Sequence, residues 1–172
     1  MLRLAGIEQE SIVDGPGIRV VIFCQGCLRH CEGCHNPETW DLKAGKLMSA
    51  DEVMTIIHNN PLCHGITFSG GEPFLQAEEL TKLATSLKGY ELASYTGFTF
   101  EELLSNGTQE QLNLLSKLDV LIDGPFVLSE RTLNLSFRGS KNQRILNISE
   151  SLKAGKAILE TSLRWNGGIF LC

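Results

Sequence analysis

FCQGCLRHCEGCHNPETW, residues 23–40, is the stretch that decides how this chain folds and what it binds. It contains four of the six cysteines, and Cys27, Cys31 and Cys34 follow one another with the spacing C-x3-C-x2-C. Disulfide bonds need particular Cα separations and directions, so three thiols this close in sequence bridge one another poorly. Wrapped round one point, their thiolates can all face the same soft centre, either a zinc ion or an iron–sulfur cluster.

A zinc site and an iron–sulfur cluster differ in the cysteine spacing that each requires. A zinc site would also use Cys24, but structural zinc sites usually hold their two C-x2-C pairs on separate turns with a longer spacer. Cys24 directly follows an apolar run, where a small buried hydrophobic residue fits. A [4Fe–4S] cluster normally has four cysteine ligands, so a set of three leaves one iron open to a substrate. We therefore predict a cluster, with a zinc-binding module as the alternative. The predicted ligands are Cys27, Cys31 and Cys34, and the cysteines predicted to take no part are Cys24, Cys63 and Cys172.

Length and composition narrow the class of protein. The chain has 172 residues, enough for one domain with a real core, and its 42% hydrophobic and 20% charged residues are typical of a soluble globular protein. A net charge of -5 argues against a protein whose main task is to bind nucleic acid phosphates. The first ten residues lack the apolar core of a signal peptide, and no apolar run approaches membrane-spanning length. We expect a cytoplasmic protein that binds neither membrane nor nucleic acid, in a compartment where clustered cysteines are usually ligands.

Strands and helices are predicted to alternate along the chain. Short apolar runs predict buried strands at residues 18–23, 65–69, 91–95 and 119–122. Capping boxes and leucines at helical spacing predict helices at residues 50–59, 75–87, 99 onward and 108–117. A further strand is expected at 144–148 and a short helix at 149–154. Residues 1–17 are expected to form a polar lead-in that ends in a turn, and residues 126–144 a polar loop.

This alternation predicts an α/β fold with a parallel sheet and right-handed crossovers. Roughly four to six units are too few for a closed eight-unit barrel, which takes about 250 residues, so we predict an open partial (βα) barrel. Ligands of such folds bind at the carboxyl ends of the strands. The cysteine loop, the Gly70–Pro73 turn, Thr96-Gly97 and Asp123 all follow predicted strands and should therefore gather on one face.

Several motifs together resemble a known superfamily. The C-x3-C-x2-C loop after the first apolar strand, with Gly-Gly-Glu-Pro at 70–73 after the second, resembles the radical S-adenosylmethionine superfamily. DGPGIR at 14–19 is similar to the activating enzymes of glycyl radical enzymes. CHNPETW at 34–40 and FRGSKNQR at 137–144 resemble anaerobic ribonucleoside-triphosphate reductase-activating proteins. The resemblance spans roughly residues 5–148 and implies a single domain over 1–172, with a tail at 149–172 of unassigned role.

The resemblance implies a function. It implies an activase that uses a [4Fe–4S] cluster to cleave S-adenosylmethionine and to generate a glycyl radical on a partner, foremost anaerobic ribonucleoside-triphosphate reductase. A low-potential electron donor of the flavodoxin or ferredoxin type would supply the electron. The alternatives are an activase of another glycyl radical enzyme, or a small-molecule enzyme similar to 7-deazaguanine synthase. The motif at 137–144 favours the reductase activase.

The resemblance also implies which residues bind the cofactor. The backbone of residues 33–35 would contact adenine, although Gly33 stands where many members carry an aromatic residue. The backbone of the 70–72 turn would hold the methionine ammonium, with the Glu72 carboxylate bracing the turn. Asp123 would line the cofactor pocket. No role is assigned to the basic loop at 138–144, since the charged side chains of such a loop usually only face solvent. The implied cofactor-binding residues are Gly33, Cys34, His35, Gly70, Gly71, Glu72 and Asp123.

Overall fold

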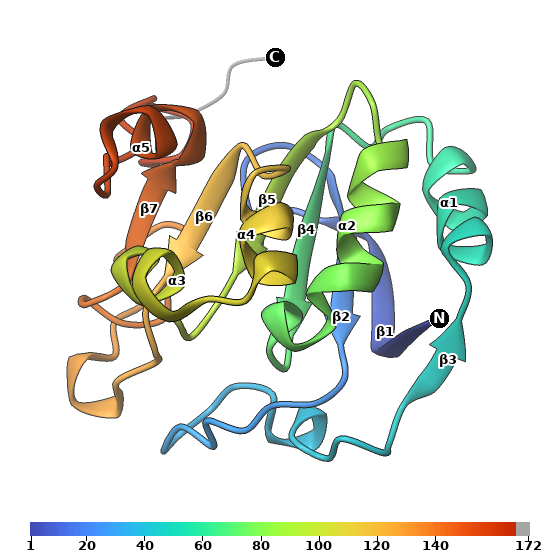
Figure 1. The fold of residues 1–172 in the computed structure, drawn as a ribbon, viewed down its shortest axis with the longest axis horizontal. Helices are drawn as coiled ribbons and strands as arrows, with labels where there is room; N and C mark the ends of the chain where they lie inside the picture. The colour runs from blue at the N-terminus through green and yellow to red at the C-terminus, as the bar shows by residue number, and fades with distance from the viewer. Residues whose placement is uncertain (168–172) are drawn as a thin grey trace.

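The computed structural model describes residues 1–167 and is built round one mixed seven-stranded sheet (Figure 1). The strand order across the sheet is β3-β1-β2-β4-β5-β6-β7. Its strands are β1 (Leu2–Ser11), β2 (Arg19–Cys24), β3 (Lys46–Met48), β4 (Gly65–Gly70), β5 (Glu91–Tyr95), β6 (Val120–Asp123) and β7 (Arg144–Asn147). The helices are α1 (Ala50–His58), α2 (Ala77–Ser86), α3 (Phe100–Asn106), α4 (Gln109–Leu115) and α5 (Ile148–Ala154), with short 3-10 turns η1 (Pro37–Thr39), η2 (Pro73–Gln76) and η3 (Leu128–Glu130).

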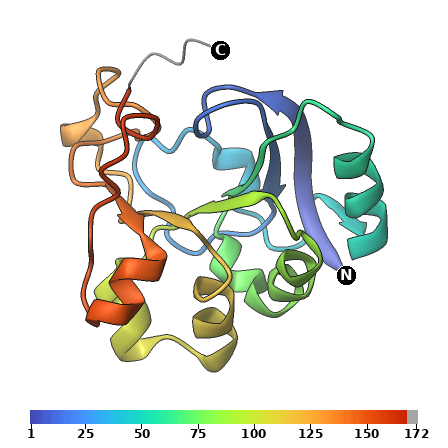
Figure 2. The same cartoon turned by 90° about the horizontal axis from the view of Figure 1, so that it is seen from above.

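The centre of the sheet confirms the predicted α/β architecture. β2, β4, β5 and β6 run parallel, and helical segments connect each strand to the next. Seen from above, the sheet curves, with its helices on the outer side and long loops on the inner side (Figure 2). Its edges are β3 and β7, so the sheet stays open, as expected of a partial barrel.

Three strands differ from the sequence-based expectation, because β1 and β3 lie outside the predicted strands and β7 is not parallel to its neighbour. The lead-in of residues 1–17 contains β1, which pairs antiparallel with β2 and with β3. Its Leu2 and Leu4 side chains are buried, but residues 8–10 are exposed. The polar residues of the exposed part interrupt the apolar pattern that would predict a strand. β7 also runs antiparallel, against β6. Antiparallel strands tolerate one solvated face, and this explains why the sequences of β1 and β7 lack a continuous apolar run.

The helices begin at the predicted caps. Complete capping boxes form at Ser49, Thr99 and Thr108, where each hydroxyl accepts a backbone N–H and the Glu or Gln three residues later bonds back. The helix predicted over 75–87 begins with η2 before α2. The buried faces of these helices join the strands in one continuous apolar core on the outer side of the sheet.

The segment after α5 belongs to the same sheet. Trp165 is 1% exposed and packs with β5, β6 and β7 residues in a second cluster, on which Phe137 also rests. The side chains of this cluster are Ala93, Val120, Ile122, Ile145 and Trp165. Cys172 lies outside the described residues. No helix in the described part of the chain has the length and hydropathy needed to cross a bilayer.

Candidate cofactor site

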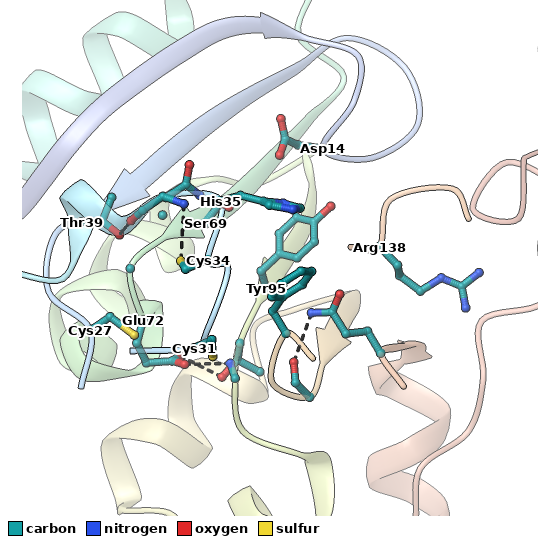
Figure 3. Close-up of a pocket in the computed structure, with 18 of the residues that line it drawn as sticks. Asp14, Cys27, Cys31, Cys34, His35, Thr39, Ser69, Glu72, Tyr95 and Arg138 are labelled. Atoms are coloured by element: carbon teal, nitrogen blue, oxygen red, sulfur yellow. Dashed lines mark hydrogen bonds between the residues drawn. The ribbon is translucent and has the colours of Figure 1, made fainter. Parts of the chain in front are cut away.

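A cavity of about 630 Å³ lies at the carboxyl ends of the parallel strands (Figure 3). Its volume lies in the range of small-molecule and cofactor sites, which is about 300–1,000 Å³. The residues that line it include 69–72 at the end of β4, 95–97 at the end of β5 and Gly124 after β6. The cysteine loop after β2 forms another wall. The predicted convergence of strand ends on one face is therefore present.

Cys27, Cys31 and Cys34 all line this cavity. The loop that carries them closes on itself, because the N–H groups of Gly26 and Cys27 donate to the carbonyl oxygens of Thr39 and Trp40 at 2.7 and 3.2 Å. Among the described residues, no three His, Cys, Asp or Glu side chains form a group that could hold one metal ion. Thiols spread round a shared space suit a cluster, in which each cysteine binds a different iron.

The electrostatics of the loop depend on burial and on its own backbone. Burial raises the pKa of the Cys27 thiol, and the backbone N–H groups of Arg29 and His30 oppose this rise. The backbone N–H of Asn36 donates to Cys34 Sγ at 3.4 Å. Backbone donors aimed at sulfur favour the thiolate, which is the form that binds iron. The loop backbone therefore fits a thiolate-bound cluster.

The remaining described cysteines lie away from the cavity. Cys24 is the last residue of β2, is fully buried, and has its pKa raised by that burial. Cys63 is buried below the other end of the sheet, and its thiol donates to the carbonyl oxygen of Gly65 at 3.2 Å. Both thiols behave as small core side chains.

The Gly70–Glu72 turn packs directly against the cysteine loop. Gly70 has φ of +93°, and a Cβ there would lie 2.6 Å from the carbonyl oxygen of Cys24. A Cβ on Gly71 would overlap the carbonyl oxygen of Gly26. The N–H groups of Gly71 and Glu72 donate to those same two oxygens, each at 2.8 Å. The glycines are therefore needed first for contact between two backbones, and the same turn also faces the cavity.

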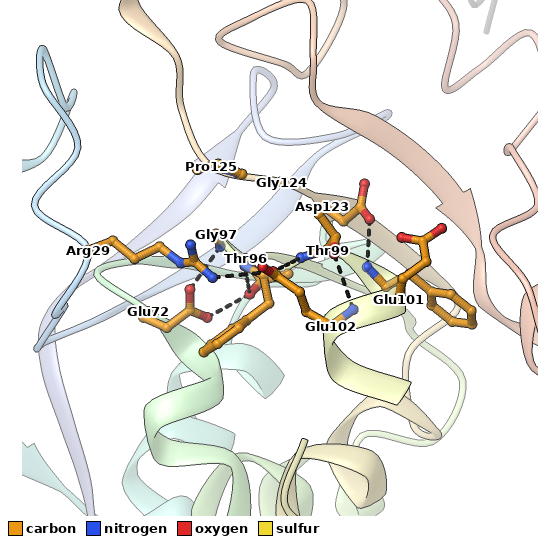
Figure 4. Close-up of polar contacts among 12 residues, drawn as sticks. Arg29, Glu72, Thr96, Gly97, Thr99, Glu101, Glu102, Asp123, Gly124 and Pro125 are labelled. Carbon is orange, nitrogen blue, oxygen red and sulfur yellow. Dashed lines mark hydrogen bonds and ion pairs between the residues drawn. The ribbon is translucent and has the colours of Figure 1, made fainter. Parts of the chain in front are cut away.

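The carboxylate of Glu72 ties two strand-end turns together (Figure 4). One oxygen accepts the N–H of Phe74 at 3.1 Å and the hydroxyl of Thr96 at 2.8 Å, and the other accepts the N–H of Gly97 at 2.8 Å. Burial raises the pKa of Glu72, while these three donors oppose the rise. The side chain thus braces the turns after β4 and β5.

Two of the predicted cofactor residues lie elsewhere. Gly33 sits beside η3, where a Cβ would lie 2.7 Å from Leu128 Cδ1. Asp123 is buried, and its carboxylate accepts the N–H of Phe100 at 2.8 Å at the start of α3 (Figure 4). The same carboxylate pairs with Arg144. Its neighbour Gly124 lines the cavity in its place. In this structure Asp123 joins elements together, and its role in cofactor binding stays a prediction. The predicted residues that do line it are Cys34, His35, Gly70, Gly71 and Glu72.

Sequence reasoning missed several lining residues, among them the polar Asp14, Tyr95 and Arg138. Asp14 accepts the hydroxyl of Ser11 at 2.5 Å and could have been identified from the DGPG motif. The Tyr95 hydroxyl donates to the carbonyl oxygen of Phe137 at 2.9 Å, and burial raises its pKa. Arg138 belongs to the basic loop, whose Arg144 instead forms ion pairs with Asp123 and Glu101.

Comparison with known proteins identifies the family. A family described as "4Fe-4S single cluster domain" matches residues 13–146. The anaerobic ribonucleoside-triphosphate reductase-activating protein of Enterobacteria phage T4 is 36% identical over 143 residues, which are 78% of this chain and 87% of that protein. Its counterpart in Escherichia coli strain K12 is 30% identical over 143 residues, 77% of this chain and 90% of that protein. The pyruvate formate-lyase-activating enzyme of Clostridium pasteurianum is 38% identical over 117 residues, 62% of this chain, which spans 49% of that enzyme. Because the match covers both the cysteine loop and the strand-end turns round the cavity, the chain belongs to the anaerobic ribonucleoside-triphosphate reductase-activating proteins, a family of the radical S-adenosylmethionine superfamily.

Proposed function

We propose that this protein uses a [4Fe–4S] cluster and S-adenosylmethionine to generate a glycyl radical on anaerobic ribonucleoside-triphosphate reductase. The observation that carries the proposal is a shared cavity. The three-cysteine loop and the Gly70–Glu72 turn line it together, at the carboxyl ends of parallel strands. Relatives named as activating proteins of that reductase support the choice of partner.

The proposed roles of the cavity residues follow from their chemistry. Cys27, Cys31 and Cys34 would hold the cluster as thiolates and leave one iron to the amino and carboxylate groups of S-adenosylmethionine. When bound, the reduced cluster and this cofactor supply a one-electron cleavage that produces a hydrogen-abstracting species. The backbone of Cys34 and His35 would contact the adenine.

The Gly70–Glu72 turn would receive the methionine ammonium. An ammonium group only donates hydrogen bonds, so it needs oxygen acceptors. The N–H groups of Gly71 and Glu72 already donate to carbonyl oxygens of the segment that carries the cysteines. The carbonyl oxygens of the turn are therefore the groups that could accept hydrogen bonds from the ammonium. The Glu72 carboxylate keeps the turn in place and is itself satisfied by three donors.

The mouth of the cavity suits a protein substrate. Ile12, Val13 and Leu133 line it and are 70%, 71% and 87% exposed. A backbone glycine has no side chain in the way, so a glycine-bearing loop of the partner could reach the reacting centre through this opening. Apolar residues round the opening would exclude water from the radical once the partner is bound.

Electron paramagnetic resonance tests the proposal. The reconstituted, reduced protein with S-adenosylmethionine is mixed anaerobically with the reductase of the same cell. We expect a doublet signal on the reductase, since the glycyl radical is split by its one remaining α-hydrogen, together with reductase activity. Methionine and 5′-deoxyadenosine should form in step with the radical. Cofactor cleavage without doublet or activity would contradict the reductase as partner.

A second candidate partner follows from a specific similarity. A pyruvate formate-lyase-activating enzyme is 38% identical over 117 residues, so another glycyl radical enzyme remains the alternative substrate. The same mixing experiment with pyruvate formate-lyase decides between the two, because the doublet appears on whichever enzyme is the substrate.

The one-electron donor is proposed to be a flavodoxin or ferredoxin.

A further inference from the structure

Arg29 is a cation within the cysteine loop, midway between Cys27 and Cys31, and its side chain leaves that loop altogether (Figure 4). It crosses to the turn after β5, where its guanidinium carbon lies 4.5 Å from the centre of the Phe98 ring. One terminal nitrogen lies 3.6 Å from the carboxylate of Glu102 in α3. A planar guanidinium stacked on an aromatic ring and paired with a carboxylate is held in one orientation.

A glycine makes room for this contact. A Cβ built on Gly97 would overlap Cδ and Nε of Arg29, so the arginine stem lies directly on the backbone of the β5–α3 turn. The same Gly97 donates its N–H to Glu72. Burial raises the pKa of that carboxyl group, and the charge of Arg29 opposes this rise. Arg29 Nε is buried without a hydrogen-bond partner among the described residues, so packing and charge hold the side chain there.

Arg29 itself lies between two of the predicted ligands, and it lines the cavity together with Cys27 and Cys31. Charge and hydrogen bonding round an iron–sulfur centre help to set its reduction potential. The side chain is thus fastened to the β5–α3 turn, while the backbone of the same residue connects two predicted ligands.

We propose that Arg29 is a positioning residue that fastens the cysteine loop to the β5–α3 turn, and thereby holds a positive charge beside the cluster. That charge stabilises the reduced, more negative state of the cluster and raises its reduction potential. The inference rests on the proposed function only in taking the loop as the cluster site. It needs neither S-adenosylmethionine cleavage nor a partner, so the inference about Arg29 and the proposed function can fail separately.

The test is the reduction potential of the cluster, measured by redox titration of the reconstituted protein with its electron paramagnetic resonance spectrum. We expect Arg29→Gln to shift the potential to more negative values and to change the spectrum of the reduced cluster. Gly97→Ala removes no charge but displaces the arginine stem, and we expect it to shift the potential in the same direction. Arg29→Lys keeps the charge without the planar stack and should give a smaller shift.

Lys43→Gln is the matched control, since it removes one cation from an exposed position on the same connecting segment. It should leave the potential unchanged. If Arg29→Gln failed to assemble a cluster, Gly97→Ala and Arg29→Lys would still test the proposed effect on the reduction potential. Parental potentials in both of these variants would overturn the proposal, as would an equal shift in Lys43→Gln, which would reduce the effect to net charge.

Discussion

Cys24 and Cys27 are neighbouring cysteines in opposite surroundings. Cys24 ends β2 inside the core, whereas Cys27 opens onto the cavity. Transfer of a thiol into the core raises its pKa, which disfavours the thiolate needed for iron binding. Cys24, a core side chain, and Cys27, a predicted ligand, are therefore only three residues apart in the sequence.

This contrast leads to a prediction about the ligands. Cys27→Ala, Cys31→Ala and Cys34→Ala should each lose the cluster, because the remaining thiolates hold too few irons. Cys24→Ala should keep it, with Cys63→Ala as the buried-cysteine control. Anaerobic iron and sulfide assays measure the outcome. Loss of the cluster in Cys24→Ala with retention in Cys27→Ala would show that the ligand register is wrong.

At the scale of elements, two ion pairs that share Arg144 join β6, α3 and β7. Asp123 ends β6 and accepts the N–H of Phe100 at the start of α3, while Arg144 at the start of β7 donates to Asp123 and to Glu101. Hydrogen bonding to Arg144 lowers the pKa of Glu101, and the pairing raises that of Arg144. These contacts explain why Arg144, the last residue of the FRGSKNQR motif, lies away from the cavity.

Removal of this arginine should expose its structural role. Arg144→Met leaves a buried carboxylate uncompensated, which costs about 3–5 kcal/mol. Asp123→Asn in the same chain removes that charge and keeps an acceptor for Phe100, so the double variant should recover part of the loss. Urea unfolding measures both, with the exposed Arg131→Met as control. A loss no greater than in the control would argue against the structural role.

At the scale of the whole molecule, the segment beyond the family match completes the fold. The matched region ends at residue 146, yet Trp165 is among the largest fully buried side chains. A Cβ on Gly15 would lie 2.9 Å from its ring, and Phe137 meets it edge-on at 5.4 Å. Trp165 therefore touches both the DGPG turn and the 126–144 loop, the two segments that carry Asp14 and Arg138 to the cavity.

Loss of this tryptophan should destabilise the protein strongly. Trp165→Ala should cost about 3–5 kcal/mol, as for other large core aromatics. For a chain of this size that corresponds to a fall in apparent melting temperature of roughly 6–20 °C. Leu163→Ala in the same segment is the control, since Leu163 is 79% exposed. Equal melting temperatures for the two variants would mean that Trp165 contributes nothing to the core.

The sequence by itself determined the parallel centre of the sheet, the helix caps and the cysteine loop, because these depend on local patterns. A continuous apolar run marks β2, a hydroxyl three residues before Glu or Gln marks a cap, and the cysteine spacing marks the loop. The tertiary structure decided what depends on distant partners. β1 is a strand because β2 and β3 pair with it, and Asp123 turns from the cavity because Arg144 and Phe100 meet it. Arg29 crosses to the β5–α3 turn because Gly97 has no side chain, and Trp165 is buried because the open sheet leaves an apolar face to cover. None of these contacts leaves a periodic signal along the chain, since each joins residues far apart in sequence.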